Sequence, residues 1–160
     1  MQRFFTWLKG RFKSSRKYLV LKQYSLFADL SDFELYLLYE LTHTRCFEAG
    51  ELIYEEGYPL EVIYFVHSGD IKLKGLYGST TDKQVGPGEY LGILDMYHGK
   101  KRSSTAIAQS DASLHAISRT DMISFIESRP RAGVKILSAI ASDFCRFVFE
   151  VAKDNEHKLD

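Results

Sequence analysis

The sequence contains little cysteine and no long apolar stretch. Cys46 and Cys145 are the only thiols among 160 residues, and they lack the spacing of a metal-binding motif. Both lie among apolar neighbours, so we expect buried free thiols. No run of about 18 apolar residues and no secretory leader is present, which predicts a cytoplasmic protein without a membrane-spanning helix.

A catalytic or metal-binding constellation is also missing. The five histidines are scattered, without a paired nucleophile or the spacing of metal ligands. We therefore expect no enzyme activity, no metal and no cofactor. His67, close to a turn, and His115, in a strand-like run, are interpreted as structural residues.

Acidic residues are absent from the first 28 residues, although the formal net charge of the whole chain is zero. Seven of the 21 basic residues lie there: Arg3, Lys9, Arg11, Lys13, Arg16, Lys17 and Lys22. The remainder has 14 basic and 21 acidic residues, so a basic arm (1–24) precedes an acidic body. Four apolar side chains of this arm share one helical face: Phe4, Phe5, Leu8 and Phe12. The arm either contacts an anionic membrane surface or a partner, or packs on the body.

A helix is predicted after the arm. Ser31 and Glu34 have the spacing of a capping box, which starts a helix that runs to about Thr42. Its inward residues are expected to be Phe33, Leu37, Leu38 and Leu41. Over the next seventy residues turn signals alternate with short β-rich runs such as 62–66 and 71–74. Short strands at this spacing predict an antiparallel sandwich or barrel. Together with the predicted helices, this indicates an α+β protein.

Two helices are predicted near the C-terminus. A short one covers 121–127 and ends before Pro130. The longest one covers 131–152 and has a heptad-like apolar row made of Val134, Leu137, Ala141, Phe144, Val148 and Val151. Ile136, Ile140 and Phe147 widen this apolar face. The helix therefore either packs on the body and pairs with a twin helix, or is a broad core helix. A polar tail (153–160) follows.

The stretch 85–108 has the features of a tight anion-binding loop. The turn Gly86-Pro87-Gly88 leads to a short apolar run, and Ile93–Tyr97 can form one helical turn after Gly92. Gly99 ends that turn, and a basic triplet precedes a strand-like run that starts at Ser103. From these residues alone, a solvated basic turn between two strands is the favoured interpretation.

The spacing within this stretch resembles the phosphate-binding cassette of the cyclic-nucleotide-binding domain family. Leu91–Met96 matches the first half of the family pattern and Arg102–Ser104 the second. The resemblance extends over about 25–152 through three further segments: 26–31, 47–57 and 63–72. It implies an antiparallel β-roll (jelly-roll-like) at about 46–118, flanked by N-terminal helices and by C-terminal helices at 119–152. In the bacterial activators of the family, the helix that matches 131–152 forms the dimer.

The resemblance also implies a ligand site. Its residues are Gly92, Ile93, Leu94, Arg102, Ser103 and Ser104. In the family, a cassette glutamate accepts a hydrogen bond from the ribose of cAMP or cGMP, and the arginine binds the cyclic phosphate. Arg102 has the position of that arginine, but Ile93 stands where the glutamate is expected. An unpaired ribose hydroxyl there would cost roughly 1–3 kcal/mol. Glu89 lies outside the cassette and is not counted as a replacement.

Two other positions depart from the family pattern. Asp95 replaces a small residue and would repel a phosphate, unless its side chain turns outward to Lys100 or Lys101. Val148 and Phe149 are apolar where the bacterial activators contact the base. The resemblance thus implies a retained fold with weakened cyclic-nucleotide recognition, in which Arg102 either holds another anion or is structural.

No helix-turn-helix segment follows the long helix, so we expect no DNA-binding domain. Two functions follow from the residues and the resemblance. In the first, the domain is a sensor that binds a nucleotide or another anion atypically and signals through a protein partner, a membrane surface or a homodimer formed by 131–152. In the second, it is a degenerate domain that serves as a protein-interaction scaffold.

Overall fold

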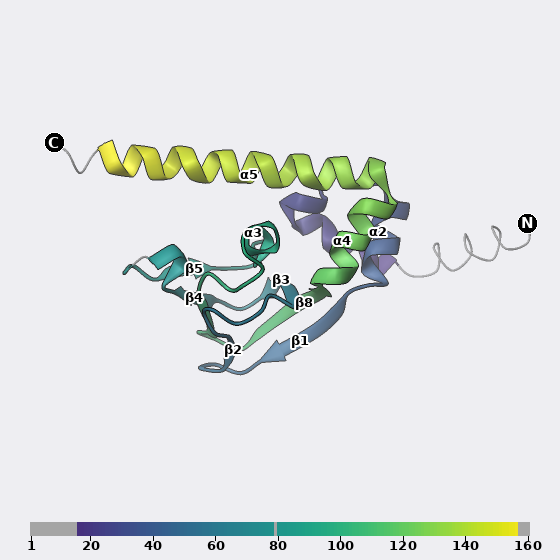
Figure 1. Ribbon diagram of the computed structural model, residues 1–160. Coiled ribbons are helices and arrows are strands. Elements are labelled where there is room, and N and C mark those ends of the chain that lie inside the picture. Colours follow the sequence, from purple (N-terminus) through teal and green to yellow (C-terminus); the bar gives the residue numbers. More distant parts are fainter. Residues whose placement is uncertain (1–15, 79, 157–160) are drawn as a thin grey trace, which may run out of the picture.

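The computed structural model describes residues 16–78 and 80–156. The predictions for the first 15 residues and for most of the polar tail lie outside this part. Within it, eight strands form two four-stranded sheets in the orders β1-β8-β3-β6 and β2-β7-β4-β5, with antiparallel neighbours (Figure 1). The strands are β1 (His43–Phe47), β2 (Leu52–Tyr54), β3 (Val62–Ser68), β4 (Ile71–Lys74), β5 (Lys83–Val85), β6 (Tyr90–Leu91), β7 (Thr105–Ala108) and β8 (Ala112–Ser118). The predicted antiparallel β-roll is confirmed.

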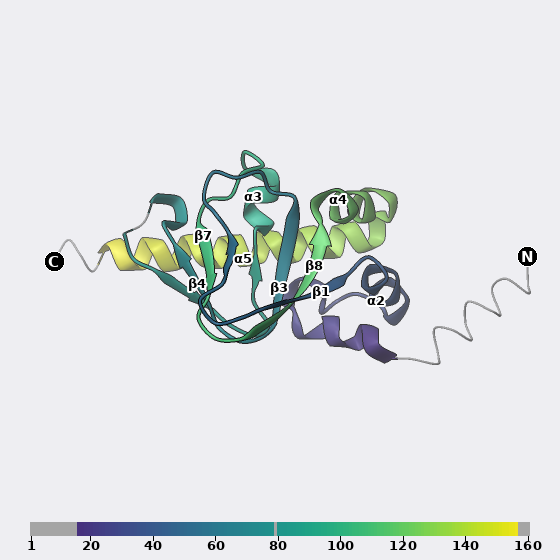
Figure 2. The same ribbon diagram turned by 90° about the horizontal axis from the view of Figure 1, so that it is seen from below.

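The helices lie beside the roll. They are the 3-10 helices η1 (Arg16–Gln23), η2 (Ser25–Phe27) and η3 (Leu76–Gly78), and the α-helices α2 (Asp32–Tyr39), α3 (Ile93–Tyr97), α4 (Arg119–Ser128) and α5 (Pro130–Glu156). Figure 2 shows α5 running across the whole roll, with α2 and α4 gathered near its first turns. The α+β architecture with a long C-terminal helix therefore agrees with the sequence.

Two apolar clusters hold these layers together. One fills the roll between its sheets and includes Tyr64, Val66 and Leu114. The other joins the roll to the helices and contains Tyr24, Phe27, Phe65 and Phe125 among its largest side chains. Tyr18 and Leu21 of η1 are buried in this second cluster. The described end of the basic arm thus packs on the body and covers apolar surface there.

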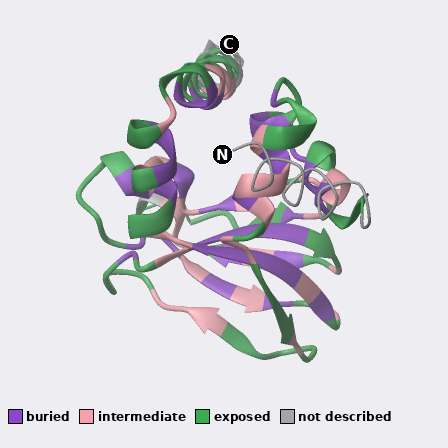
Figure 3. Cartoon of the chain, turned by 90° about the vertical axis from the view of Figure 1, so that its right-hand side faces the viewer, coloured by how far each residue is buried: buried purple, intermediate pink, exposed green. Residues whose placement is uncertain are grey.

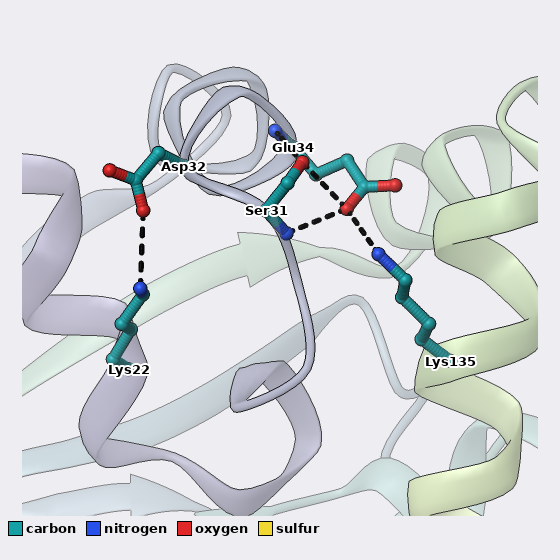
Figure 4. Close-up of polar contacts among 5 residues, drawn as sticks. All are labelled: Lys22, Ser31, Asp32, Glu34 and Lys135. Atoms are coloured by element: carbon teal, nitrogen blue, oxygen red, sulfur yellow. Dashed lines mark hydrogen bonds and ion pairs between the residues drawn. The ribbon is translucent and has the colours of Figure 1, made fainter.

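The predicted capping box at the start of α2 is present. The Ser31 hydroxyl accepts a hydrogen bond from the Glu34 backbone amide, and the Ser31 amide donates to Glu34 Oε2 at 2.7 Å (Figure 4). Lys135 Nζ of α5 donates to the same oxygen at 2.8 Å. A second ion pair joins Lys22 to Asp32 at 3.1 Å. Glu34 therefore stabilises the first turn of α2 and also connects α2 to α5.

The predicted inward face of α2 needs correction. Phe33 is half exposed, whereas Leu35 and Leu38 are fully buried. Phe33 and Leu37 share a helical face, but α2 turns the neighbouring face that carries Leu35 towards the core. The hydrophobic period identifies residues that lie together but leaves the orientation of a short, strongly apolar helix undetermined.

Helix α5 has two distinct apolar faces. Ala132, Ile136 and Ile140 are buried against the body. The described side chains of the heptad-like row are exposed, and four of them are large apolar residues: Val134, Leu137, Phe144, which also borders the cavity, and Val148. Figure 3 looks along α5 and shows its buried residues on the side of the body and exposed residues on the other side. Among the described helices, none is long and apolar enough to cross a membrane.

The expectation of buried thiols is wrong. Cys46 and Cys145 are both exposed. Cys46 lies on β1, an edge strand whose first four residues are exposed, and Cys145 lies on the part of α5 that faces away from the body. Apolar neighbours in the sequence did not imply burial because neither element is covered on that side.

Glu34 generates a prediction about acid stability. Burial raises the pKa of its carboxyl, but hydrogen bonds from Lys135 and Ser31 outweigh this effect and hold the pKa below its usual 4.5. A pKa that is lower in the folded state stabilises the fold above the unfolded-state pKa, and this contribution is lost as the pH falls through the folded-state pKa. We therefore expect Glu34→Gln to lose about 1 kcal/mol of unfolding free energy at neutral pH and to show a smaller further loss below about pH 4.5.

Urea unfolding followed by circular dichroism between about pH 7 and pH 3 measures both quantities. Glu40→Gln, an exposed position at the other end of α2, is the matched control and should keep the wild-type pH dependence. Parallel pH curves for wild type and Glu34→Gln would contradict the prediction.

Candidate functional site

The cassette is a short loop between two strands. Gly92 follows β6 and precedes α3, the helical turn that the sequence predicts at Ile93–Tyr97. Its φ of 90° lies in the left-handed region that favours glycine, and Gly88 in the preceding turn has the same φ. Gly99 and Lys100 then turn the chain with φ values of 70° and 59°. The local conformation therefore agrees with the cassette predicted from sequence.

A cavity of about 360 Å³ lies between this loop, the roll and α5. Five of the six predicted site residues line it: Gly92, Ile93, Leu94, Ser103 and Ser104. Arg102 is not among the lining residues. Asp95, Tyr54, Tyr90 and side chains from α5 complete much of the wall. The volume is at the lower end of the usual range for small-molecule sites.

Arg102 is directed into the protein. It is 5% exposed, and Nη2 donates a hydrogen bond to the Val62 carbonyl oxygen at 2.6 Å. The guanidinium carbon lies 3.7 Å from the centre of the Tyr54 ring, a cation–π contact. Nη1 is buried without a hydrogen-bond partner, and a Cβ at Gly92 would come within 2.6 Å of it. Gly92 thus provides the space for the guanidinium.

Burial also affects the charge of Arg102. Desolvation lowers the pKa of the guanidinium, and Tyr54, Tyr64 and Asp95 act in the opposite direction. Asp95 is the carboxylate among these groups. The buried cation is therefore stabilised by a backbone carbonyl, aromatic rings and one nearby carboxylate.

Asp95 is buried as well. It is 4% exposed, its Oδ2 accepts a hydrogen bond from the Ser103 backbone amide at 3.2 Å, and Oδ1 has no partner. Lys100 and Lys101 are exposed. The outward orientation towards these lysines, considered from the sequence, is therefore wrong, because α3 turns residue 95 to its inner side. The carboxylate lies in the wall of the cavity.

Ile93 supplies no acceptor for a ribose hydroxyl. Its side chain is 1% exposed and belongs to the apolar cluster between the roll and the helices. Glu89 does not replace it, since Glu89 Oε2 accepts a hydrogen bond from the Gly86 amide at 2.8 Å. The cassette therefore differs from the family pattern in side-chain direction as well as in residue type.

The residues of α5 that line the cavity come earlier in the helix than the sequence indicated. Val148 and Phe149 are exposed and do not line the cavity, whereas Asp143 and Phe147 do. Asp143 Oδ2 accepts hydrogen bonds from Tyr90 at 2.7 Å and from Ser25 at 3.0 Å. Burial, followed by the Asp143 carboxylate, raises the pKa of Tyr90.

Sequence reasoning missed Asp143, although a signal for it exists. Residues 136, 140, 143 and 147 form one stripe at steps of three and four, and its first two members are the buried isoleucines of α5. Extending that stripe would have placed Asp143 and Phe147 on the inner face. The departure has a simple cause: after Gly133 the helix contains no further glycine or proline, so an alignment over its later turns can shift by several residues.

His115, which the sequence analysis interprets as structural, contacts Tyr24 inside the protein. His115 is buried, and its Nδ1 lies 2.7 Å from the Tyr24 hydroxyl. Burial, with a smaller contribution from nearby His67, lowers the pKa of His115. Among the described residues, no three histidine, cysteine or acidic side chains are grouped so that they could hold a metal ion.

Known proteins similar to this chain share its roll. The family model described as "Cyclic nucleotide-binding domain" matches residues 44–129. The cyclic AMP receptor protein of Thermus thermophilus is 26% identical over 119 residues, which cover 72% of this chain and 55% of that protein. The chain spans between 6% and 55% of the length of the three curated relatives that it matches.

Solved structures agree with this assignment. The catabolite activator protein of Thermus thermophilus superposes with a TM-score of 0.69 at 26% identity, covering 82% of this chain and 62% of that chain. The N-terminal domain of a transcriptional regulator from Streptomyces coelicolor superposes with a TM-score of 0.67 at 25% identity, covering 82% and 93%.

The position of Arg102 predicts a structural role that can be measured. Arg102→Ala removes the hydrogen bond to Val62 and the contact with Tyr54, and it leaves the Asp95 carboxylate without its cationic neighbour. We expect a loss of about 2–3 kcal/mol in the free energy of unfolding, measured with urea. The adjacent, exposed Lys101→Ala should change it by less than about 0.5 kcal/mol. Equal effects of the two variants would refute a structural role for Arg102.

Proposed function

The chain belongs to the cyclic nucleotide-binding domain family, and on that premise we propose that it is a non-catalytic regulatory domain with weak, atypical binding of cyclic nucleotides. The observation that supports this proposal is the direction of Arg102, whose guanidinium binds Val62 and Tyr54 inside the protein and does not line the cavity. Asp95 lines the cavity instead. A cyclic phosphate would therefore meet a carboxylate before it met the arginine.

The energetic consequence is substantial. A charge-assisted hydrogen bond contributes about 1.5–3 kcal/mol, and an unpaired ribose hydroxyl at Ile93 costs roughly 1–3 kcal/mol. Together these losses amount to about 2.5–6 kcal/mol, which corresponds to roughly 10²–10⁴-fold in affinity. The fold is kept while both polar contacts expected for a cyclic nucleotide are weakened.

Helix α5 is the element through which a ligand would act. Asp143, Phe144 and Phe147 belong to α5 and also line the cavity. An occupant of the cavity that contacts them differently in two positions of α5 would shift the population between those positions. In this proposal the domain acts inside the cell, and its signal passes to a protein partner or to a second copy of the chain.

The domain organisation proposed from the sequence is kept here: a basic arm (1–24), a cyclic-nucleotide-binding-like domain (25–152) and a polar tail (153–160). The buried positions of Tyr18 and Leu21 favour docking of the last part of the arm on the domain. Contact of the remaining arm with an anionic membrane surface is the other role that its basic charge supports.

Direct binding measurements test the proposed recognition. Isothermal titration calorimetry of the full chain with cAMP and with cGMP should give dissociation constants about 10²–10⁴-fold weaker than that of the Thermus thermophilus cyclic AMP receptor protein for cAMP under identical conditions. An affinity within tenfold of that receptor would refute weak binding.

A scaffold or dimer role is the second candidate, and the outward face of α5 favours it. Val134, Leu137, Phe144 and Val148 expose between 41% and 64% of their surface along one side of a single helix. A row of large apolar residues at heptad spacing is typical of a helix that pairs with another. This role does not require a ligand in the cavity.

Light scattering coupled to gel filtration tests this role. We expect the wild-type chain to be a dimer and the double variant Leu137→Glu/Val148→Glu to be a monomer, because two buried carboxylates would face each other across the helix pair. Ser142→Glu, an exposed position outside the heptad-like row, is the matched control and should remain a dimer. A monomeric wild type at all concentrations would exclude the homodimer and leave a different protein partner.

A further inference from the structure

Asp95 occupies a position where a bound anion would be stabilised. Its Oδ2 accepts the Ser103 backbone amide at 3.2 Å, and this amide belongs to the strand-entry segment that lines the cavity. Arg102 lies on the other side of Gly92, and the Asp95 charge is among the groups that offset its burial. The Ser103 amide and the charge of Arg102 therefore already interact with a negative group of the protein itself, the Asp95 carboxylate.

The other carboxylates of the cavity wall are differently placed. Glu89 accepts the Gly86 amide, and Asp143 is held by Tyr90, Ser25 and Arg146. Asp95 differs because its second oxygen, Oδ1, is buried and unpartnered. Buried polar atoms without a partner are rare in folded proteins, and a carboxylate oxygen left in this way calls for a donor. Lys83 and Arg146 also line the cavity, and Arg146 is paired with Asp143, so the negative charge of Asp95 is the feature that sets its part of the wall apart.

We propose that Asp95 is a built-in anion that takes the place of a ligand phosphate in this cavity, and that the site consequently selects a small molecule that carries no phosphate. The carboxylate holds the Ser103 amide and adds a negative charge that favours the buried Arg102 cation, which are the two tasks a bound phosphate would perform. This inference rests on the proposed function and names the ligand class of the same site.

Charge and size support this ligand class. A second anion at the Ser103 amide would lie within a few ångströms of the Asp95 carboxylate in a poorly solvated wall, where like charges repel strongly. The remaining cavity of about 360 Å³ has aromatic side chains from β6 and α5 in its wall, including Tyr90, Phe144 and Phe147. An uncharged ring-containing molecule suits this aromatic part of the wall and brings no second negative charge to Asp95.

Removing the carboxylate tests the proposal with two simple probes, inorganic phosphate and cAMP. Asp95→Ala should free the Ser103 amide and leave the Arg102 charge without its internal partner, so anions gain a site. We expect calorimetry to show cAMP binding to Asp95→Ala at least tenfold tighter than to wild type. Inorganic phosphate should raise the unfolding midpoint of Asp95→Ala above that in chloride of equal ionic strength.

Two further variants keep the test decisive. Asp29→Ala removes one exposed carboxylate elsewhere and controls for net charge and for the general stabilising effect of phosphate, so it should behave as wild type. Asp95→Ser, with a shorter polar side chain, repeats the experiment if Asp95→Ala fails to fold. Folded Asp95 variants that bind cAMP and phosphate no better than Asp29→Ala would overturn the built-in anion, while weak binding by wild type would still support the proposed function. Tight cAMP binding by wild type would overturn both.

Discussion

The buried guanidinium of Arg102 is the constraint on which the site depends. A cation that is 95% buried requires compensation from every side, and here the Val62 carbonyl, the Tyr54 ring and the Asp95 charge provide it. Gly92 is required next to it because a Cβ would occupy the space of Nη1. The guanidinium thus requires glycine at position 92 and connects the cassette to Val62 and Tyr54.

This arrangement separates two properties that the family combines. The roll, the cassette turn and the long helix are those of a cyclic-nucleotide-binding domain, and the relatives include a cyclic AMP receptor protein. The polar groups of the cassette, however, are directed to one another across the loop. A fold of this kind tolerates such a change because its stability comes from the two apolar clusters and not from the ligand site.

The sequence was most informative where the determinants are local. Ser31 and Glu34 form a capping box within four residues, and Gly92 with α3 depends on a few neighbouring positions, so both could be predicted. The direction of Arg102 could not, because its partners Val62 and Tyr54 are 40 and 48 positions away in the numbering. Periodicity grouped the residues of α2 and α5 correctly into faces, but which face is covered depends on elements elsewhere in the chain. The errors at Phe33 and the two cysteines share this cause, whereas the one at Val148 comes from a shifted alignment.

The first half of α5 contacts the body through Ala132, Lys135, Ile136 and Ile140. This inner stripe ends beside the cavity at Asp143 and Phe147. From Asp143 to the end of the helix at Glu156 the chain rises by about 20 Å. The contact of Asp143 with Tyr90 and Ser25 is therefore the point about which the rest of the helix would tilt. A tilt of a few degrees at that contact would move the end of α5 by more than an ångström. A small displacement of Asp143 beside the cavity would therefore become a larger displacement at the end of the helix.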